Sequence, residues 1–213
     1  MTTTLLDTHD MVLVHRVFRR ELALLPQLVR SAPDPVRLRA HGEELLGFLH
    51  HHHSGEDDLV WPRLRTRVLL QQELVDRMEA QHERVAALSE QAELGFAAWG
   101  GDAGRGEALA QVLEQLHAAV VEHLDEEERE VLPLVAGCFT QAEWDELGER
   151  GLAAIAPRRR LVTLAHILED ADDAERAAFL TRVPAPVRLL YRLLGRRQHA
   201  KETGPLRIPL QRT

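Results

Sequence analysis

The chain has 213 residues, of which 45% are hydrophobic, 28% charged and only 4% aromatic. This composition is that of a folded, helix-rich protein and excludes a disordered chain, and the length allows one large domain or two small ones. The formal net charge of −8 argues against nucleic acid as the main partner. A single cysteine, Cys138, excludes a disulfide framework and a cysteine-based zinc site.

Targeting and membrane signals are missing from the sequence pattern. No apolar run approaches the ~18 residues of a membrane-spanning helix, and the first residues lack the basic and apolar stretches of a secretory signal. We therefore expect a cytoplasmic protein with no integral membrane segment.

Apolar residues recur with helical periodicity from the start of the chain and predict an all-α fold. The first helix follows a cap at Asp7 or Thr8, and Pro26 should kink or end it. Three more long helices are predicted over residues 34–62, 68–99 and 106–136. Four helices of similar length with short links predict an up-down-up-down four-helix bundle.

The C-terminal part of the chain has a different character. A capping-box pattern from Thr140 to Glu143 predicts a fifth helix, and later prolines divide the remainder into short helices and a loose tail. We therefore expect a bundle over 1–138 and a helical appendage with a basic tail over 139–213. Residues 1–150 carry a net charge of −14, whereas residues 151–213 carry +6.

Two interpretations of this basic region remain open. It is either an appendage docked on the acidic bundle, which we favour, or its segment 186–197 is an amphipathic helix that contacts a membrane or a partner.

Histidine is unusually abundant, with 12 residues, and part of it follows an internal repeat. The pattern His-x3-Glu-x4-(Trp or Leu)-Pro begins at His52 and again at His123, 71 residues later. Acidic residues follow both glutamates of the pattern. Upstream of each copy, a single histidine lies on the apolar stripe of the preceding helix, four residues after a methionine. The chain therefore reads as two copies of one helical hairpin.

Two such hairpins packed about a pseudo-twofold axis would direct six metal-ligating groups to one point in the core. These candidate metal ligands are His15, His52, Glu56, His82, His123 and Glu127. Taken singly, each has an ordinary interpretation, as a core histidine or as one partner of an i,i+4 surface pair. Agreement of all six under one pseudo-symmetry favours a metal site, because an ionised glutamate inside a bundle needs a compensating cation or hydrogen bonds.

The ligand types indicate which metal to expect. Nitrogen and carboxylate oxygen without thiolate, in a set of six, suit two iron or manganese ions better than structural zinc, which takes four ligands. Glu56 and Glu127 can bridge such ions, as carboxylates do in other di-metal helix bundles. Oxo or hydroxo bridges and small exogenous ligands would complete the coordination, so the site should bind O2, peroxide or water.

Residues 48–62 and 123–133 resemble the paired signatures of the hemerythrin-like (HHE cation-binding) family, over about residues 7–136. The resemblance implies a four-helix bundle with a non-haem di-iron centre, bridged by two carboxylates and an oxygen atom and held by the six residues above. Oxygen-carrying members have a second third-helix histidine where this chain has Ala86, and an aspartate where it has Glu128. These departures imply a site that has one imidazole fewer and more carboxylate than those of oxygen carriers, which argues against reversible O2 carriage.

Other histidines carry weaker expectations. Three consecutive helical residues fan over about 200–300°, so the neighbours of His52 cannot all face one site. His53 with Asp57 is an alternative register, disfavoured because it breaks the match to Pro133, and His166 with Asp170 reads as a surface pair.

Three functions follow from this sequence. The leading hypothesis is a di-iron protein that binds O2 or reacts with peroxide, in O2 or redox sensing or in an oxidative-stress response. The second is a di-iron enzyme of the peroxidase or catalase kind. The third is an iron-handling protein, or a non-catalytic helical interaction module whose histidines are structural.

Overall fold

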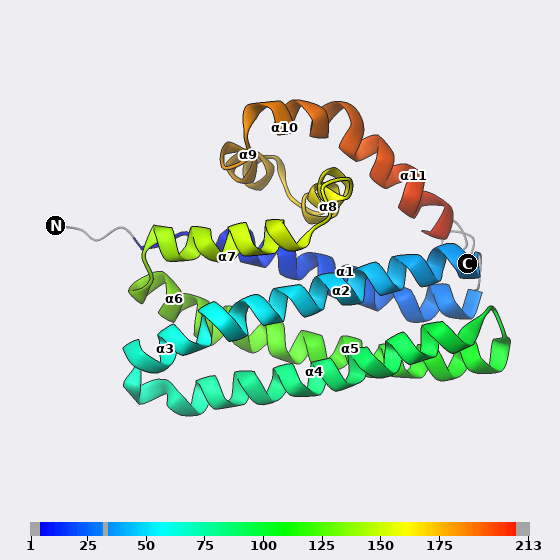
Figure 1. Ribbon diagram of the computed structural model, residues 1–213, viewed down its shortest axis with the longest axis horizontal. Coiled ribbons are helices and arrows are strands. Elements are labelled where there is room, and N and C mark those ends of the chain that lie inside the picture. The colour runs from blue at the N-terminus through cyan, green and yellow to red at the C-terminus, as the bar shows by residue number, and fades with distance from the viewer. Residues whose placement is uncertain (1–4, 32–33, 208–213) are drawn as a thin grey trace.

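The computed structural model describes residues 5–31 and 34–207, and every regular element within these ranges is helical (Figure 1). The all-α prediction is therefore confirmed. Four long helices lie side by side: α1 (His9–Ser31), α2 (Pro35–Leu59), α4 (Gln72–Trp99) and α5 (Ala103–Glu126). Helix α1 packs on α5 and α2, and α4 packs on the same two helices.

Shorter elements complete the chain. Helix α3 (Trp61–Arg67) and a 3-10 turn (Leu69–Gln71) link α2 to α4, while a π-helix, η2 (Glu127–Val131), and α6 (Leu132–Cys138) continue α5. The C-terminal elements are α7 (Gln141–Ala154), α8 (Arg160–Ile167), α9 (Asp173–Thr181), α10 (Ala185–Leu190), a second π-helix, η3 (Tyr191–Gly195), and α11 (Arg196–Arg207).

Local signals explain most helix ends. The Asp34 side chain accepts the backbone N–H of Arg37 at 3.1 Å and so caps α2. Gly100 and Gly101 have φ values of 55° and 92°, a left-handed turn that glycine adopts without strain and that reverses the chain between α4 and α5. Both bonds of the predicted capping box at Thr140 and Glu143 are present.

Prolines interrupt the helices less than expected. Helix α1 continues through Pro26 to Ser31, because the last turns bury Leu28 and Val29 in the core. Pro205 likewise lies inside α11, where a loose tail was predicted. Residues 208–213 of that tail and residues 32–33, between α1 and α2, lie outside the described residues.

Two apolar clusters fill the interior between the long helices. The larger includes Phe18, Leu49, Val85 and Val120. The smaller includes the side chains of Met11, Trp61, Met78 and Leu132. Along each long helix and the residues that continue it, a buried histidine lies near the change from one cluster to the other. A polar layer therefore lies between two apolar ones.

The C-terminal helices cover one side of the four long ones. Helix α7 packs along α2, α8 packs along α1, and η3 and α11 pack against α8. Figure 1 shows α8 to α11 on the side of α1 and α2, with α4 at the opposite edge. Among the described residues, no helix combines the length and the apolar character needed to cross a membrane. The domain boundary at residue 138 and the cytoplasmic location stay predictions.

Candidate metal centre

The polar layer brings together all six side chains that the repeat singled out. They come from all four long helices and from η2, and every one of these side chains is at most 7% exposed. In chain order they are His15 (α1), His52 and Glu56 (α2), His82 (α4), His123 (α5) and Glu127 (η2). His15 and Glu127, which are 112 positions apart in the sequence, thus meet at one place in the core.

Glu56 lies between imidazoles of two helices. Its Oε1 is 3.4 Å from His52 Nε2, and its Oε2 is 3.4 Å from His82 Nε2. Hydrogen bonds between such atoms span about 2.7–3.2 Å. The longer separations indicate atoms that face a shared space rather than each other.

Glu127 has the equivalent place in the second hairpin. Its Oε2 lies 3.4 Å from His15 Nε2 and 3.6 Å from His123 Nε2. Each glutamate therefore stands between one histidine of its own hairpin and one of the other. This is the arrangement expected of carboxylates that bridge two ions.

The donor atoms form two groups that share Glu56. One group contains His53, Glu56, His82 and His123, and the other contains His15, His52, Glu56 and Glu127. Within each group the donor atoms all lie within 4.8 Å of one another. Two neighbouring groups with a common carboxylate provide room for two cations side by side.

The same layer holds every buried side-chain polar atom without a hydrogen-bond partner in the described part of the chain. These atoms are His15 Nε2, His52 Nε2, His53 Nε2, both Glu56 oxygens and Glu127 Oε2. Leaving a buried polar atom unpaired costs about 1–3 kcal/mol, and more for a charged group. Six such atoms in one place fit a bound cation, which would satisfy all of them at once.

Neighbouring polar groups hold three imidazoles by their other nitrogen. His82 Nδ1 bonds to Asp57 at 2.7 Å, His15 Nδ1 to Glu128 at 2.8 Å, and His123 Nδ1 to Gln81 Oε1 at 3.1 Å. Because these oxygens accept hydrogen bonds, each imidazole donates from Nδ1, and in its neutral form it has a lone pair on Nε2, which faces the layer. Metal-ligating histidines are commonly oriented in this way.

Asp57 and Glu128 are equivalent residues of the two hairpins. Each follows a glutamate of the layer, and each orients the single upstream histidine of the opposite hairpin. Glu128 also accepts from Arg19, so its carboxylate is directed away from the donor groups. The acidic residues after both glutamates were the signal in the sequence, but their role as supports was not predicted.

His53 is a further imidazole at the layer. Its side chain is buried and its ring stacks on that of His82, with centroids 4.1 Å apart and planes 15° apart. His52 and His53 both face the layer because the two donor groups lie side by side and adjacent residues, about 100° apart, reach one each. Five imidazoles therefore adjoin the layer, one more than the repeat singled out, and the set of ligands stays a prediction.

Burial dominates the electrostatics of the layer. It raises the pKa of Glu56, and together with the charge of Glu56 it raises the pKa of Glu127 to about 8. Burial also lowers the pKa of His52, His53 and His123 well below the usual value, which keeps these imidazoles neutral. The protein supplies too little positive charge to balance two carboxylates here, and a metal cation would supply it.

His82 is the exception among the histidines. Burial disfavours its charged form, but the hydrogen bond with Asp57 and the nearby carboxylate of Glu56 outweigh burial and raise its pKa to about 9. A proton therefore occupies this imidazole at neutral pH as long as no cation replaces it, and metal binding would release that proton.

Comparison with known families agrees with this geometry. The family model of the hemerythrin HHE cation-binding domain matches residues 6–135, which include both hairpins and the whole polar layer. The chain belongs to this hemerythrin family. Membership implies a metal cofactor, usually iron, and confirms the resemblance found in the sequence. Searches of curated proteins and of solved structures gave no match.

A π-helix carries part of the hemerythrin site. The helix predicted over 106–136 is helical throughout, but the change to π-helical geometry at Glu127 was not predicted. The wider turn lets two consecutive residues reach one imidazole: Glu127 approaches His15 Nε2 and Glu128 bonds to His15 Nδ1. Single π-turns inside α-helices are frequent at functional sites.

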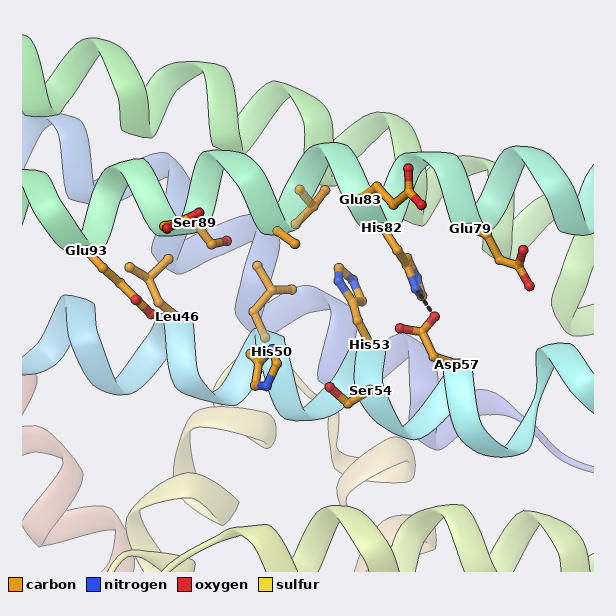
Figure 2. Close-up of a pocket in the computed structure, with 14 residues that line it drawn as sticks. Leu46, His50, His53, Ser54, Asp57, Glu79, His82, Glu83, Ser89 and Glu93 are labelled. Atoms are coloured by element: carbon orange, nitrogen blue, oxygen red, sulfur yellow. Dashed lines mark hydrogen bonds and ion pairs between the residues drawn. The ribbon is translucent and has the colours of Figure 1, made fainter.

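An open groove leads from the surface to the hemerythrin centre. Figure 2 shows it between α2 and α4, with His53 and His82 at its inner wall and Asp57 bonded to His82. Its volume is about 700 Å³. Carboxylates are prominent in its lining, namely Asp57, Glu79, Glu83, Glu90 and Glu93. The small side chain of Ala86 also lines the groove.

Proposed function

We propose that this hemerythrin-domain protein holds two iron ions in the polar layer, between four helices arranged up-down-up-down, and binds O2 or reacts with peroxide there. The observation that carries the proposal is the set of six unpartnered buried atoms, all directed into one layer. The alternating order in which the long helices cross the two apolar clusters supports the topology. Manganese is the alternative metal, since it accepts the same nitrogen and oxygen ligands.

The two donor groups would divide the ligands between the ions. His53, His82 and His123 would hold one ion, His15 and His52 the other, and the two glutamates would join them. Two octahedral ions offer about twelve positions, of which five imidazoles and two bridging carboxylates fill about nine. When bound, such a pair of ions supplies redox chemistry toward O2 or peroxide at the remaining positions.

The groove residues would select the small ligand. Apolar side chains of Leu49 and Val85 line the groove together with carboxylates, so neutral O2 and H2O2 can pass while anions are repelled. Asp57 would keep His82 oriented while a ligand enters beside it. Sensing of O2 or redox state, or an oxidative-stress response, would use this access.

Elemental analysis with an optical spectrum tests the proposal. We expect about two irons per chain and a visible absorption band that changes on adding O2 or H2O2. His52→Ala should lose iron and the band. His51→Ala is the matched control, because His51 is the exposed neighbour of His52 and should keep both. Iron near zero in the purified, iron-loaded protein would refute the proposal.

The width of the groove favours a second candidate function, a peroxide-consuming enzyme. Turnover requires repeated entry and release, which an open path to His53 and His82 permits. Steady O2 evolution from H2O2 by the iron-loaded protein would support this function. Ala86→Phe should then slow turnover by narrowing the groove while leaving the iron content unchanged. No turnover at all would leave binding as the function.

A further inference from the structure

The segment of α10 and η3 exposes an unusual run of apolar side chains. Helices that dock on a core normally turn their apolar face inward. Here four leucines point to solvent: Leu189 (57% exposed), Leu190 (45%), Leu193 (54%) and Leu194 (51%). Together they expose about as much side chain as two fully exposed leucines.

The opposite face of the same segment fixes this orientation. Tyr191 is buried, and Gly195 packs so closely on α8 that an added Cβ would lie 3.0 Å from the carbonyl oxygen of Leu161. The segment cannot roll its leucines inward without losing this close approach. The exposed leucines are therefore a stable feature of the surface.

Basic side chains accompany the leucines. Arg192, Arg196 and Arg197 are exposed, and no ion pair in the described part of the chain includes them. By contrast, arginines that dock the C-terminal helices are paired, as Arg159 is with Glu44. Positive charge without a partner, next to exposed leucine, is the pattern of a helix that lies on an anionic lipid surface.

We propose that this leucine–arginine face, formed by Leu189, Leu190, Arg192, Leu193, Leu194, Arg196 and Arg197, binds the surface of an anionic lipid membrane. The leucines would enter the boundary between headgroups and acyl chains, and the arginines would contact lipid phosphates. Figure 1 shows α10 at the edge of the molecule opposite α4, where a flat surface can reach it.

A second copy of the chain fits this face less well. A stable dimer buries about 800 Å² on each partner, whereas four half-exposed leucines offer less than half of that area. A twofold interface would also bring the same arginines of both copies close together, because such an interface pairs a patch with itself. A membrane removes both difficulties, since it offers anionic charge and accepts a small apolar patch.

Co-sedimentation of the full-length protein with vesicles tests the proposal. We expect binding to vesicles rich in phosphatidylglycerol, no binding to pure phosphatidylcholine, and weakening as salt is raised. Leu193→Gln/Leu194→Gln should reduce binding at least ~10-fold, since each half-buried leucine contributes about fivefold. Arg192→Gln/Arg196→Gln/Arg197→Gln should reduce it ~100-fold, at about fivefold for each arginine.

The matched control is Leu69→Gln/Leu70→Gln, which removes two leucines that are exposed elsewhere, at 73% and 97%. This variant should bind like the wild type, and circular dichroism should show unchanged helix content in all variants. Failure of the wild type to bind anionic vesicles would overturn the proposal. So would equal loss in the control, or a leucine-dependent dimer or complex with an acidic peptide in place of vesicle binding.

Discussion

Two buried clusters of histidine and glutamate differ in how their charge is compensated. The metal centre is one, and the other, which we call the docking cluster, joins α1 and α2 to α8 and α11. The docking cluster consists of Arg20, Glu21, His41, His166, Glu169, His199 and Arg207. Glu21 there is 1% exposed, as deeply buried as Glu127 of the metal centre.

Glu21 has internal partners that the glutamates of the metal centre lack. Arg20 and Arg207 donate to Glu21 Oε1, and His41 Nε2 lies 3.1 Å from Oε2. Burial alone would raise the pKa of Glu21, but the nearby His166, the hydrogen bond with His41 and the charge of Arg207 hold it well below the usual range. In the metal centre burial prevails, and the pKa of Glu127 rises to about 8.

The comparison gives a physical criterion for a metal site. The donor atoms of His166, Glu169 and His199 also lie within 4.8 Å of one another, so proximity of ligand types is not decisive. Two arginines already supply the positive charge at the docking cluster. Unpartnered atoms, rather than residue types, distinguish the metal centre. The predicted surface pair of His166 with Asp170 was wrong, because Asp170 pairs with Arg20 and His166 faces His199.

Removing the metal should produce the largest effect. If the free metal concentration is a thousand times the Kd of each of two sites, the two ions together add about 8 kcal/mol to the free energy of unfolding. Chelation should then lower the Tm by on the order of 20 °C. Differential scanning calorimetry before and after chelator, with iron added back, measures this. An unchanged Tm would mean that the layer is stable without a cation and would remove the distinction between the two clusters.

Glu21→Ala should cause the next largest decrease in Tm. This decrease should be the same with and without bound metal. It leaves Arg20 and Arg207 without their shared carboxylate, and breaking a buried pair costs about 3–5 kcal/mol. We expect the Tm to fall by about 10 °C while the iron content stays at the wild-type value. Loss of iron in this variant would show that the two clusters are coupled.

Asp57→Asn should weaken metal binding more moderately. The side chain of residue 57 would still accept from His82 but would lose its negative charge, and such supporting groups contribute about 10–100-fold to metal affinity. Competition with a calibrated chelator measures the change. Asp58→Asn is the control, because the exposed Asp58 pairs with Arg150 instead of a ligand histidine; equal weakening in both variants would argue against orientation of His82 as the cause.

Acid should weaken the docking cluster slightly. Burial and the neighbouring His166 lower the pKa of His199 to about 4. Below about pH 6.5 the unfolded chain therefore binds a proton at this histidine that the folded protein does not, so stability falls as the pH falls toward 4.

After allowance for solvent screening, we expect the free energy of unfolding to fall by about 1 kcal/mol between about pH 7 and about pH 5. This loss corresponds to a decrease in Tm of ~3 °C. Melting curves of the wild type, His199→Gln and the exposed control His51→Gln measure it. The dependence should shrink only in His199→Gln, and an equal slope in all three proteins would contradict the assignment.

The sequence predicted those parts of the site that obey local or repeated patterns. Helix starts at Asp34 and Thr140 follow from capping residues, and the six candidate ligands follow from a repeat that both hairpins share. His53 could not be found in this way, because its counterpart in the second hairpin is Leu124, an apolar core residue. The two hairpins are equivalent in the carboxylates that orient a histidine, Asp57 and Glu128. They differ at the position of His53 and Leu124.

The remaining features depend on contacts that no local pattern encodes. The docking cluster joins Glu21 to Arg207 across 186 positions, and nothing near either residue points to the other. The π-turn at η2 has a sequence that is also compatible with an ordinary α-helix. Composition and periodicity predict well which residues are buried. They do not predict which of the buried polar groups have a hydrogen-bond or ion-pair partner.

The π-helix η2 also limits how the chain length can vary. Deleting a single residue at Arg129 would close η2 into ordinary α-helical geometry and leave the helix after it facing the same way, because a π-turn accommodates one extra residue. Val131 and Val135 would keep their places in the apolar cluster around Trp61, but Glu127 and Glu128 would no longer both reach His15. The number of residues in this stretch therefore sets how the second hairpin holds the His15 imidazole.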